Sequence, residues 1–289
     1  MVIRKLLRMK KIISASRRSD LVAFFPDWLA SAVKEEHAFV YGPSGQTYRV
    51  DLSPKSVHTF ILWSKNFAHL IEDCFSLRSL LKKYDQLYLH FTITGLGGTP
   101  IEKGVPRPGE AVAQLDDLVK IAEHPQRISV RFDPILYWRE QGEEKTNLFF
   151  FEELAPVLQQ KGIRRVRLSF AQWYARAKRR AIRQHFDYID PPQDKKIEDA
   201  GYLVELARRY GLNLFACSQK FLTEDTGIDP SACIDGKLLQ DLHPLQEPAS
   251  MKKDRSQRSE CGCTESVDIG SYTQSCPHSC LYCYANPRE

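Results

Sequence analysis

Three cysteines close together near the end of the chain have the spacing of a metal-binding loop. Cys276, Cys280 and Cys283 follow a CxxxCxxC pattern, and Tyr282 stands just before the third cysteine. Clustered thiolates are soft ligands that select iron–sulfur clusters, zinc or copper(I). Around a [4Fe–4S] cluster, three cysteines leave one iron without a protein ligand, and chemistry can occur at that open iron. A zinc site completed by His278 or by an upstream thiol is the alternative interpretation.

The pattern of Cys276, Cys280, Tyr282 and Cys283 resembles the cluster-binding loop of radical S-adenosylmethionine (radical SAM) enzymes. The resemblance implies that S-adenosylmethionine (SAM) chelates the open iron through its amino and carboxylate groups. It also implies that an electron from the cluster cleaves a C–S bond and releases a 5′-deoxyadenosyl radical, which acts on a substrate that the sequence does not name. Radical SAM enzymes usually carry this loop near their N-terminus, whereas here it occupies residues 276–283 of 289.

Four segments spread along the chain carry a wider resemblance: SASRRSD at 14–20, WSKN at 63–66, RFDP at 131–134, and the cysteine-rich tail from Lys253. They are similar to a family of bacterial proteins known only as domain of unknown function eighteen-forty-eight. That family has radical-SAM-like cysteines at its C-terminus, but its reaction is not established. The resemblance therefore implies an architecture more than an activity.

Four further cysteines are candidates for a second site, namely Cys217, Cys233, Cys261 and Cys263. Gly262 lies between the last two and lets the backbone bend between two ligands. Four thiolates would fully coordinate an auxiliary [4Fe–4S] cluster or a structural zinc, which would hold the tail in place or relay electrons. The alternative is that Cys217 is a buried strand thiol and Cys233 packs in the core. Cys74 lies on the apolar stripe of an expected helix, and we expect it in the core.

Strand-like runs alternate with helices of about a dozen residues, a pattern typical of βα units around a parallel sheet. The runs are Lys11–Ala15, Thr59–Trp63, Leu87–Thr94, Arg127–Phe132, Val166–Phe170 and Asn213–Cys217. We expect an α/β fold with a TIM-like (β/α) barrel, complete or partial, whose chemistry lies where the strands end. A doubly wound open sheet is the alternative. Residues 1–222 would form the barrel core, and the cysteine-rich segment 223–289 would pack over its mouth.

A circular permutation would reconcile the late cysteine loop with a radical SAM barrel. Ser266–Ile269 would be a short strand equivalent to the first barrel strand of those enzymes, and Lys11–Ala15 would be the second. In the superfamily the end of that second strand meets the SAM amino group, usually through a Gly-Gly-Glu motif that is absent here. The resemblance therefore implies that SAM is held by polar side chains of the segment that follows, namely Ser16, Arg17, Arg18 and Asp20. A serine hydroxyl or Asp20 would accept from the ammonium, and an arginine would pair with the carboxylate.

Basic residues without an intervening acid suggest a polyanion as a partner. They are Arg164, Arg165, Arg167, Arg176, Lys178, Arg179, Arg180 and Arg183. Trp173 and Tyr174 interleave, so the run could grip phosphates and stack on bases. The second functional hypothesis is therefore a non-catalytic iron–sulfur or zinc protein that docks nucleic acid through these arginines. A solvated helix face is the simpler interpretation. The enzymatic hypothesis implies instead a reductant such as flavodoxin or ferredoxin.

Composition points to a globular chain with dedicated thiol sites. The formal net charge of +5 permits an anionic partner without requiring one. Of the eight cysteines, seven follow residue 216, which favours metal or cluster binding over disulfides. No apolar run approaches the ~18–20 residues that span a bilayer, and the basic N-terminus lacks the features of a signal peptide. We expect a cytoplasmic protein without a membrane partner.

Overall fold

The computed structural model describes residues 9–42, 44–285 and 287, and it is an α/β structure built on one large parallel sheet. Eight strands lie in the order β12 (Asp229–Pro230), β11 (Asn213–Ala216), β9 (Arg165–Phe170), β6 (Ile128–Ile135), β5 (Leu87–Thr92), β4 (Val57–Ser64), β1 (Lys11–Ala15) and β13 (Val267–Asp268). From β1 to β12 this order follows the chain without the reversal that a doubly wound sheet requires. Among the described residues no pairing joins the edge strands β12 and β13, so a complete barrel is not found.

The central strands have the composition of strands that are covered on both faces. All eight residues of β4 are buried, and β-branched and aromatic side chains dominate it. Its side chains alternate between the two faces of the sheet, so that Phe60 and Leu62 point to one hydrophobic core while Ile61 and Trp63 point to another. The sheet therefore needs a cover on each side.

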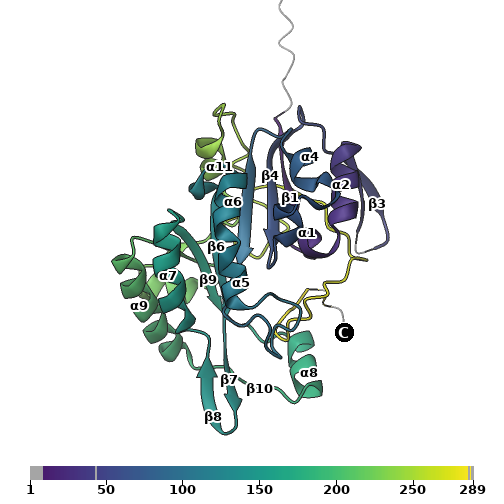
Figure 1. Cartoon of the computed structure of the whole chain (residues 1–289). Coiled ribbons are helices and arrows are strands. Elements are labelled where there is room, and N and C mark those ends of the chain that lie inside the picture. The colour runs from purple at the N-terminus through teal and green to yellow at the C-terminus, as the bar shows by residue number, and fades with distance from the viewer. Residues whose placement is uncertain (1–8, 43, 286, 288–289) are drawn as a thin grey trace, which may run out of the picture.

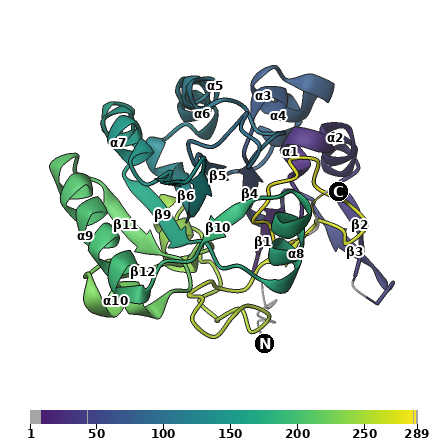
Figure 2. The same ribbon diagram turned by 90° about the horizontal axis from the view of Figure 1, so that it is seen from below.

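Helices that follow successive strands cover the outer face of the sheet (Figure 1, Figure 2). They are α1 (Leu21–Phe24), α2 (Pro26–Lys34), α3 (Ala68–Ile71), α4 (Leu77–Leu81), α5 (Pro108–Ala113), α6 (Leu115–Ala122), α7 (Phe150–Gln160), α9 (Gln193–Arg209) and α10 (Lys220–Asp225), with short 3₁₀ turns η1 (Cys74–Ser76) and η2 (Pro125–Arg127). The longer helices present an apolar stripe, such as Leu115, Leu118 and Ala122 on α6. This stripe packs with the sheet in the main core.

The C-terminal segment covers the inner face of the sheet. Ile234 and the leucines of α11 (Gly236–Leu242) pack against Ile12, Ile61 and Tyr88 from three neighbouring strands. The same segment supplies both edge strands, β12 and β13. The tail thus joins the sheet on the inner face of β1, β4 and β5 and at both edges.

Smaller elements surround this framework. The hairpin of β2 (His37–Tyr41) and β3 (Thr47–Asp51) flanks α2 (Figure 1). An antiparallel sheet is formed by β7 (Tyr137–Glu140), β8 (Glu143–Thr146) and β10 (Asp187–Ile189). Helix α8 (Ala175–Arg183), which comes just before β10 in the chain, lies against the C-terminal loop. No helix in the described part of the chain is both long enough and apolar enough to cross a membrane.

Candidate functional site

A pocket of about 240 Å³ opens where β1, β4, β6 and β9 end. It brings together two sets of residues that the sequence singled out from opposite ends of the chain. Its walls include Ser16, Arg17, Arg18, Asp20, Cys276, Cys280 and Cys283. The two sets meet because β1 and β13, the first and last strands of the sheet in chain order, pair with each other.

The strand expected at Ser266–Ile269 exists as β13 and lies parallel to β1, so this prediction is confirmed. Ser14 is in register with Asp268. The Asp268 carboxylate accepts hydrogen bonds from Ser14 Oγ at 2.9 Å and from the Arg17 backbone N–H at 2.8 Å. Close approach continues at Gly270, where an added Cβ would lie 1.9 Å from Ser16 Oγ. The two segments are therefore locked together just before the cysteine loop begins.

His278, inside the loop, ties it to the end of β1. Its Nε2 lies 2.8 Å from Asp20 Oδ2, and its Nδ1 lies 2.7 Å from the carbonyl oxygen of Gly104. Asp20 also accepts from Ser64 Oγ and from the Lys65 backbone N–H, at 2.8 and 2.9 Å. Both ring nitrogens of the buried His278 are thus engaged by the protein, which leaves neither nitrogen available to a metal.

The three loop cysteines line one pocket. Cys280 is buried, and Cys276 and Cys283 are partly buried. Burial raises the pKa of Cys276 to about 12, and burial also raises the pKa of Cys280 and of Cys283. At neutral pH the metal-free thiols are therefore protonated, and a metal must displace these protons when it binds.

A buried ion pair lies beside Cys280. The Glu102 side chain, which is fully buried, accepts from Lys65 Nζ at 2.8 Å and from Thr94 Oγ1 at 2.8 Å. The Tyr282 hydroxyl donates to the same carboxylate. Burial lowers the pKa of Lys65, but the charge and hydrogen bond of Glu102, with other acidic neighbours, outweigh burial, and the pKa lies above the usual value. The Lys65 ammonium thus places a positive charge next to a sulfur of the loop.

Arg180 of α8 anchors the loop backbone. Its Nη1 donates to the carbonyl oxygens of Cys280, Leu281 and Cys283 at 3.3, 3.0 and 2.9 Å. The basic run was expected to act as one surface, and that expectation is wrong for Arg180 and Arg167, whose side chains are 6% and 1% exposed. Sequence reasoning missed this anchor because a buried arginine in a basic helix gives no local signal.

The four predicted SAM-binding residues line the pocket, and each also has protein partners. Arg17 bonds to Asp254 and Ser266, both at 3.3 Å. Arg18 donates to the Gly270 carbonyl at 2.7 Å and stacks on Tyr272. Ser16 Oγ accepts from the Arg18 backbone N–H at 2.9 Å, and Asp20 is bound as described above. These side chains are therefore held in fixed orientations around the pocket.

The other predicted thiols also converge. Cys233 and Cys263 are buried in the hydrophobic cluster on the inner face of the sheet, and Cys217 and Cys261 pack against that cluster. Cys217 lines the same pocket as the cysteine loop. Cys74 lies apart from both groups; it is partly exposed on η1, with its thiol 3.7 Å from Glu72 Oε2, so its expected place in the core is wrong.

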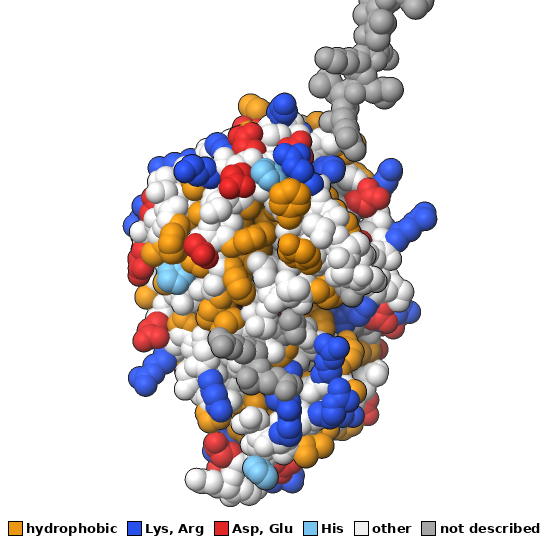
Figure 3. Space-filling view, turned by 90° about the vertical axis from the view of Figure 1, so that its right-hand side faces the viewer, with side chains coloured by type: hydrophobic (Ala, Val, Ile, Leu, Met, Phe, Trp, Pro, Cys, Tyr) orange, Lys and Arg blue, Asp and Glu red, His pale blue; other side chains and the backbone are white. Residues whose placement is uncertain are grey.

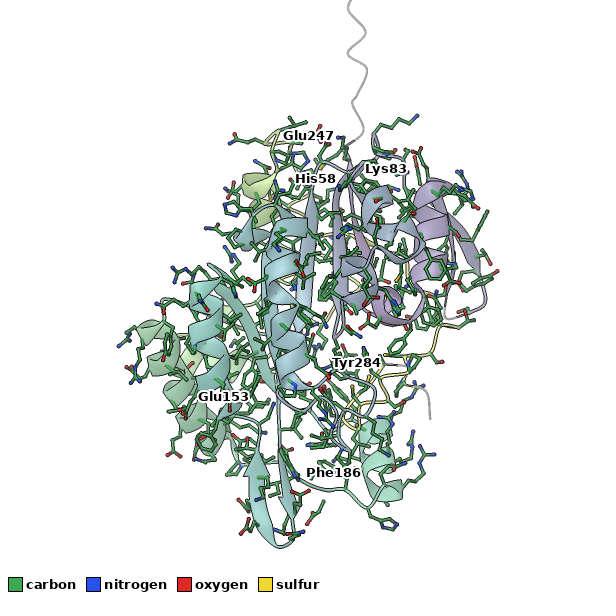
Figure 4. The ribbon with its side chains drawn as sticks, viewed as in Figure 1. His58, Lys83, Glu153, Phe186, Glu247 and Tyr284 are labelled. Atoms are coloured by element: carbon green, nitrogen blue, oxygen red, sulfur yellow. The ribbon has the colours of Figure 1, made fainter. Side chains whose placement is uncertain are left out.

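A separate group of donors lies at the opposite end of the sheet from the cysteine loop. The ligand atoms of Asp85, His243 and Glu247 are within 4.8 Å of one another. Figure 4 shows Glu247 and His58 at this end and Tyr284 at the other. Lys10 Nζ forms ion pairs with Asp85 and Glu247 at 3.2 and 2.8 Å, so the two carboxylates already share a cation.

Comparison with known proteins identifies the family of this chain. No curated protein matches the chain. A family model described as "Domain of unknown function (DUF1848)" matches residues 12–285, which include β1, the polar strand ends and the cysteine loop. The chain therefore belongs to the DUF1848 family.

Proposed function

We propose that this chain is an iron–sulfur enzyme of the radical SAM type, in which Cys276, Cys280 and Cys283 hold a [4Fe–4S] cluster. The observation that carries the proposal is that the three cysteines of one loop line the same pocket as the segment that follows β1. A three-thiolate loop matches a cluster with one open iron. The substrate would occupy the remainder of the pocket.

The donor set fits such a cluster better than a zinc site completed by His278. A Cys₃His zinc site requires a nitrogen of His278, but both ring nitrogens bind protein oxygens. The loop backbone is held in place by Arg180, so the sulfurs are oriented before a metal arrives. The Lys65 ammonium beside Cys280 would offset part of the negative charge of a thiolate-bound cluster.

The strand order supports a permuted, partial TIM-like barrel. Seven strands from β1 to β12 follow one another as in a (β/α) barrel, and β13 adds a strand before β1. β13 leads directly toward the cysteine loop, as the first strand does in radical SAM enzymes. The segment Ser16–Asp20 then corresponds to the segment of those enzymes that meets SAM. Fixed polar side chains stand here in place of their Gly-Gly-Glu motif.

When bound, the cluster and SAM would supply the one-electron cleavage that yields a 5′-deoxyadenosyl radical. The protein would bind and orient the substrate and shield the reaction from solvent. The Asp20 carboxylate would need to exchange one of its present partners to receive the SAM ammonium. Arg131 reaches the pocket from β6, pairs with Asp133 and lies over the Trp63 ring at 5.3 Å. This fixed guanidinium is suited to an anionic group on the substrate.

The test is the formation of 5′-deoxyadenosine. Anaerobically reconstituted protein, given SAM and dithionite or a flavodoxin, should produce it. The triple variant Cys276→Ala, Cys280→Ala, Cys283→Ala should produce none, while Cys74→Ala, which removes a thiol far from the pocket, should match the natural chain. A natural chain that holds iron and sulfide yet never cleaves SAM would overturn the enzymatic proposal.

A second candidate function rests on the exposed basic face of α8. Arg176, Lys178 and Arg179 are exposed there, and a surface hollow beside them is lined by Arg176, Arg179 and Arg183. Figure 3 shows Lys and Arg side chains gathered in the lower part of this side of the molecule. Here the chain would be a non-catalytic metal-bearing protein that docks nucleic acid. Its affinity for single-stranded RNA or DNA should fall steeply with salt and drop further in Arg176→Ala, Arg179→Ala. Salt-independent binding would reject this function.

A further inference from the structure

We propose that Cys217, Cys233, Cys261 and Cys263 form a second metal centre, closed by four thiolates, that fastens the C-terminal segment to the sheet. The four thiols are free of disulfides and come from three separate stretches of chain. A site with four protein sulfurs leaves no open position, so its role differs from that of the cysteine loop. The proposal does not depend on the radical SAM reaction.

Backbone pairing brings the three stretches together. Cys217 directly follows β11, and its N–H donates to the Leu168 carbonyl of β9 at 2.8 Å. Cys233 lies just after β12. The third stretch is joined to the second because the Gly262 N–H donates to the Ser231 carbonyl at 3.2 Å. A Cβ on Gly262 would lie only 3.0 Å from that carbonyl oxygen, so glycine lets the Cys261–Cys263 turn approach closely.

The four cysteines gather in one cluster on the inner face of the sheet. Cys233 and Cys263 are buried in it, and Cys217 and Cys261 are partly buried and pack against it. The Ile234 backbone N–H donates to Cys263 Sγ at 3.4 Å. Ser231 Oγ lies 3.9 Å from Cys233 Sγ. Hydrogen bonds to ligand sulfurs of this kind tune and orient metal–thiolate sites.

Two buried guanidinium groups supply opposite charge. Arg167 is 1% exposed and donates at 2.9 Å to the carbonyl of Ala232, the residue before Cys233. Arg131, on the neighbouring strand β6, interacts electrostatically with Cys233 as well. Arg131 is paired with Asp133, but the Nε atoms of both arginines have no hydrogen-bond partner among the described residues. Two buried cations beside four thiols are favourable when the thiols are ionised around a metal, because such a site carries net negative charge.

Thiolate chemistry admits an iron–sulfur cluster or a single zinc at such a site, and the larger cluster fits better because no three of the four sulfurs lie within 4.8 Å of one another. Both would join β11, β12 and the loop before β13 across the inner face of the sheet. Since Cys217 also lines the main pocket, the centre forms part of the pocket wall. Loss of the metal should therefore loosen the C-terminal segment that carries the cysteine loop.

The experiment uses the full chain with the cysteine loop removed by Cys276→Ala, Cys280→Ala, Cys283→Ala. After anaerobic reconstitution with iron and sulfide, or loading with zinc, this variant should still retain one metal centre. Further replacement of Cys217→Ser and Cys261→Ser should remove it. Iron with matching sulfide identifies a cluster, and zinc without sulfide identifies a single ion; either result supports the centre. A loop variant that folds, by circular dichroism, and retains neither metal overturns it.

A second measurement covers the case in which the loop variant does not fold. In the otherwise natural chain, Cys217→Ser, Cys261→Ser should lower the metal content by one centre. It should also speed tryptic cleavage of the segment 243–262 several-fold, whereas Cys74→Ser should change neither. Unchanged metal content in the double variant overturns the proposal, whether or not the protein cleaves SAM.

Discussion

His278 Nε2 and Asp20 Oδ2 lie 2.8 Å apart, although 258 positions separate the two residues in the chain. The contact joins the cysteine loop to the N-cap of α1, where Asp20 also accepts from the Ala23 N–H at 3.0 Å. The other ring nitrogen, Nδ1, lies 2.7 Å from the Gly104 carbonyl oxygen. The His278 side chain thus fastens the loop at its centre through both ring nitrogens.

Replacing Asp20 should damage both the fold and the site. Asp20→Ala leaves the donors of Ala23, Ser64 and Lys65 unpaired in a buried place, and we expect a loss of about 3 kcal/mol in the free energy of unfolding. Chemical denaturation measures it. The matched change Asp27→Ala, on the first turn of the next helix, should cost much less. A small, equal effect at both positions would show that the Asp20 network does not hold the loop.

Arg180 should be essential for cluster retention while its neighbour Arg179 is not. Arg180→Ala removes three hydrogen bonds to loop carbonyls and should lower stability by about 2 kcal/mol. Iron retained after anaerobic gel filtration should fall, because the loop backbone is no longer fixed. Arg179 is exposed, so Arg179→Ala serves as the control. Equal iron retention in the two variants would contradict the anchoring role.

Glu102 should be among the most sensitive buried charges. Glu102→Ala leaves the Lys65 ammonium buried without its partner, and breaking a buried pair costs about 3–5 kcal/mol. The free energy of unfolding, measured with urea, should drop accordingly. Glu153→Ala, on the exposed side of α7 (Figure 4), is the matched control and should be nearly neutral. A neutral Glu102 variant would mean that water reaches Lys65 in solution.

The turn before β4 should contribute an acid-sensitive increment of stability. Hydrogen bonds from the Ser53 N–H, the Ser53 hydroxyl and the Ser56 hydroxyl lower the pKa of Asp51 to about 2. A lowered folded-state pKa stabilises the protein above the unfolded value of about 4, and this increment is lost as the pH falls toward 2. Asp51→Asn should therefore be less stable than the natural chain at pH 6, with the gap narrowing by pH 2.5. A gap that stays constant across urea titrations at these pH values would refute the assignment.

Most strands of the sheet could be predicted because each has a recognisable local sequence pattern. β1 has the predicted bounds Lys11–Ala15, and the other expected strands lie within a few residues of their predicted ends. A short apolar run bounded by polar residues is a strong signal of a strand. The two edge strands are harder to predict from the sequence, since each has only two residues. β13 was found only because the cysteine loop required a strand before it.

The residues that line the pocket could be predicted from the sequence, but the residues that support them could not. Cysteine spacing identifies the loop, and the strand ends identify Asp20. Glu102 lies in an irregular loop, and its importance comes from Lys65 and Tyr282, which are remote in sequence. Arg180 looked like part of a charged surface. Such roles depend on tertiary contacts, which no local pattern encodes.

The most direct test of the account is the electron paramagnetic resonance spectrum of the Cys217→Ser, Cys261→Ser chain after anaerobic reconstitution and reduction, recorded with and without SAM. This variant isolates the cysteine loop as a cluster site. We predict a reduced [4Fe–4S] signal that changes when SAM binds the open iron. A chain with no such signal, or with a signal that SAM leaves unchanged, would contradict the central claim.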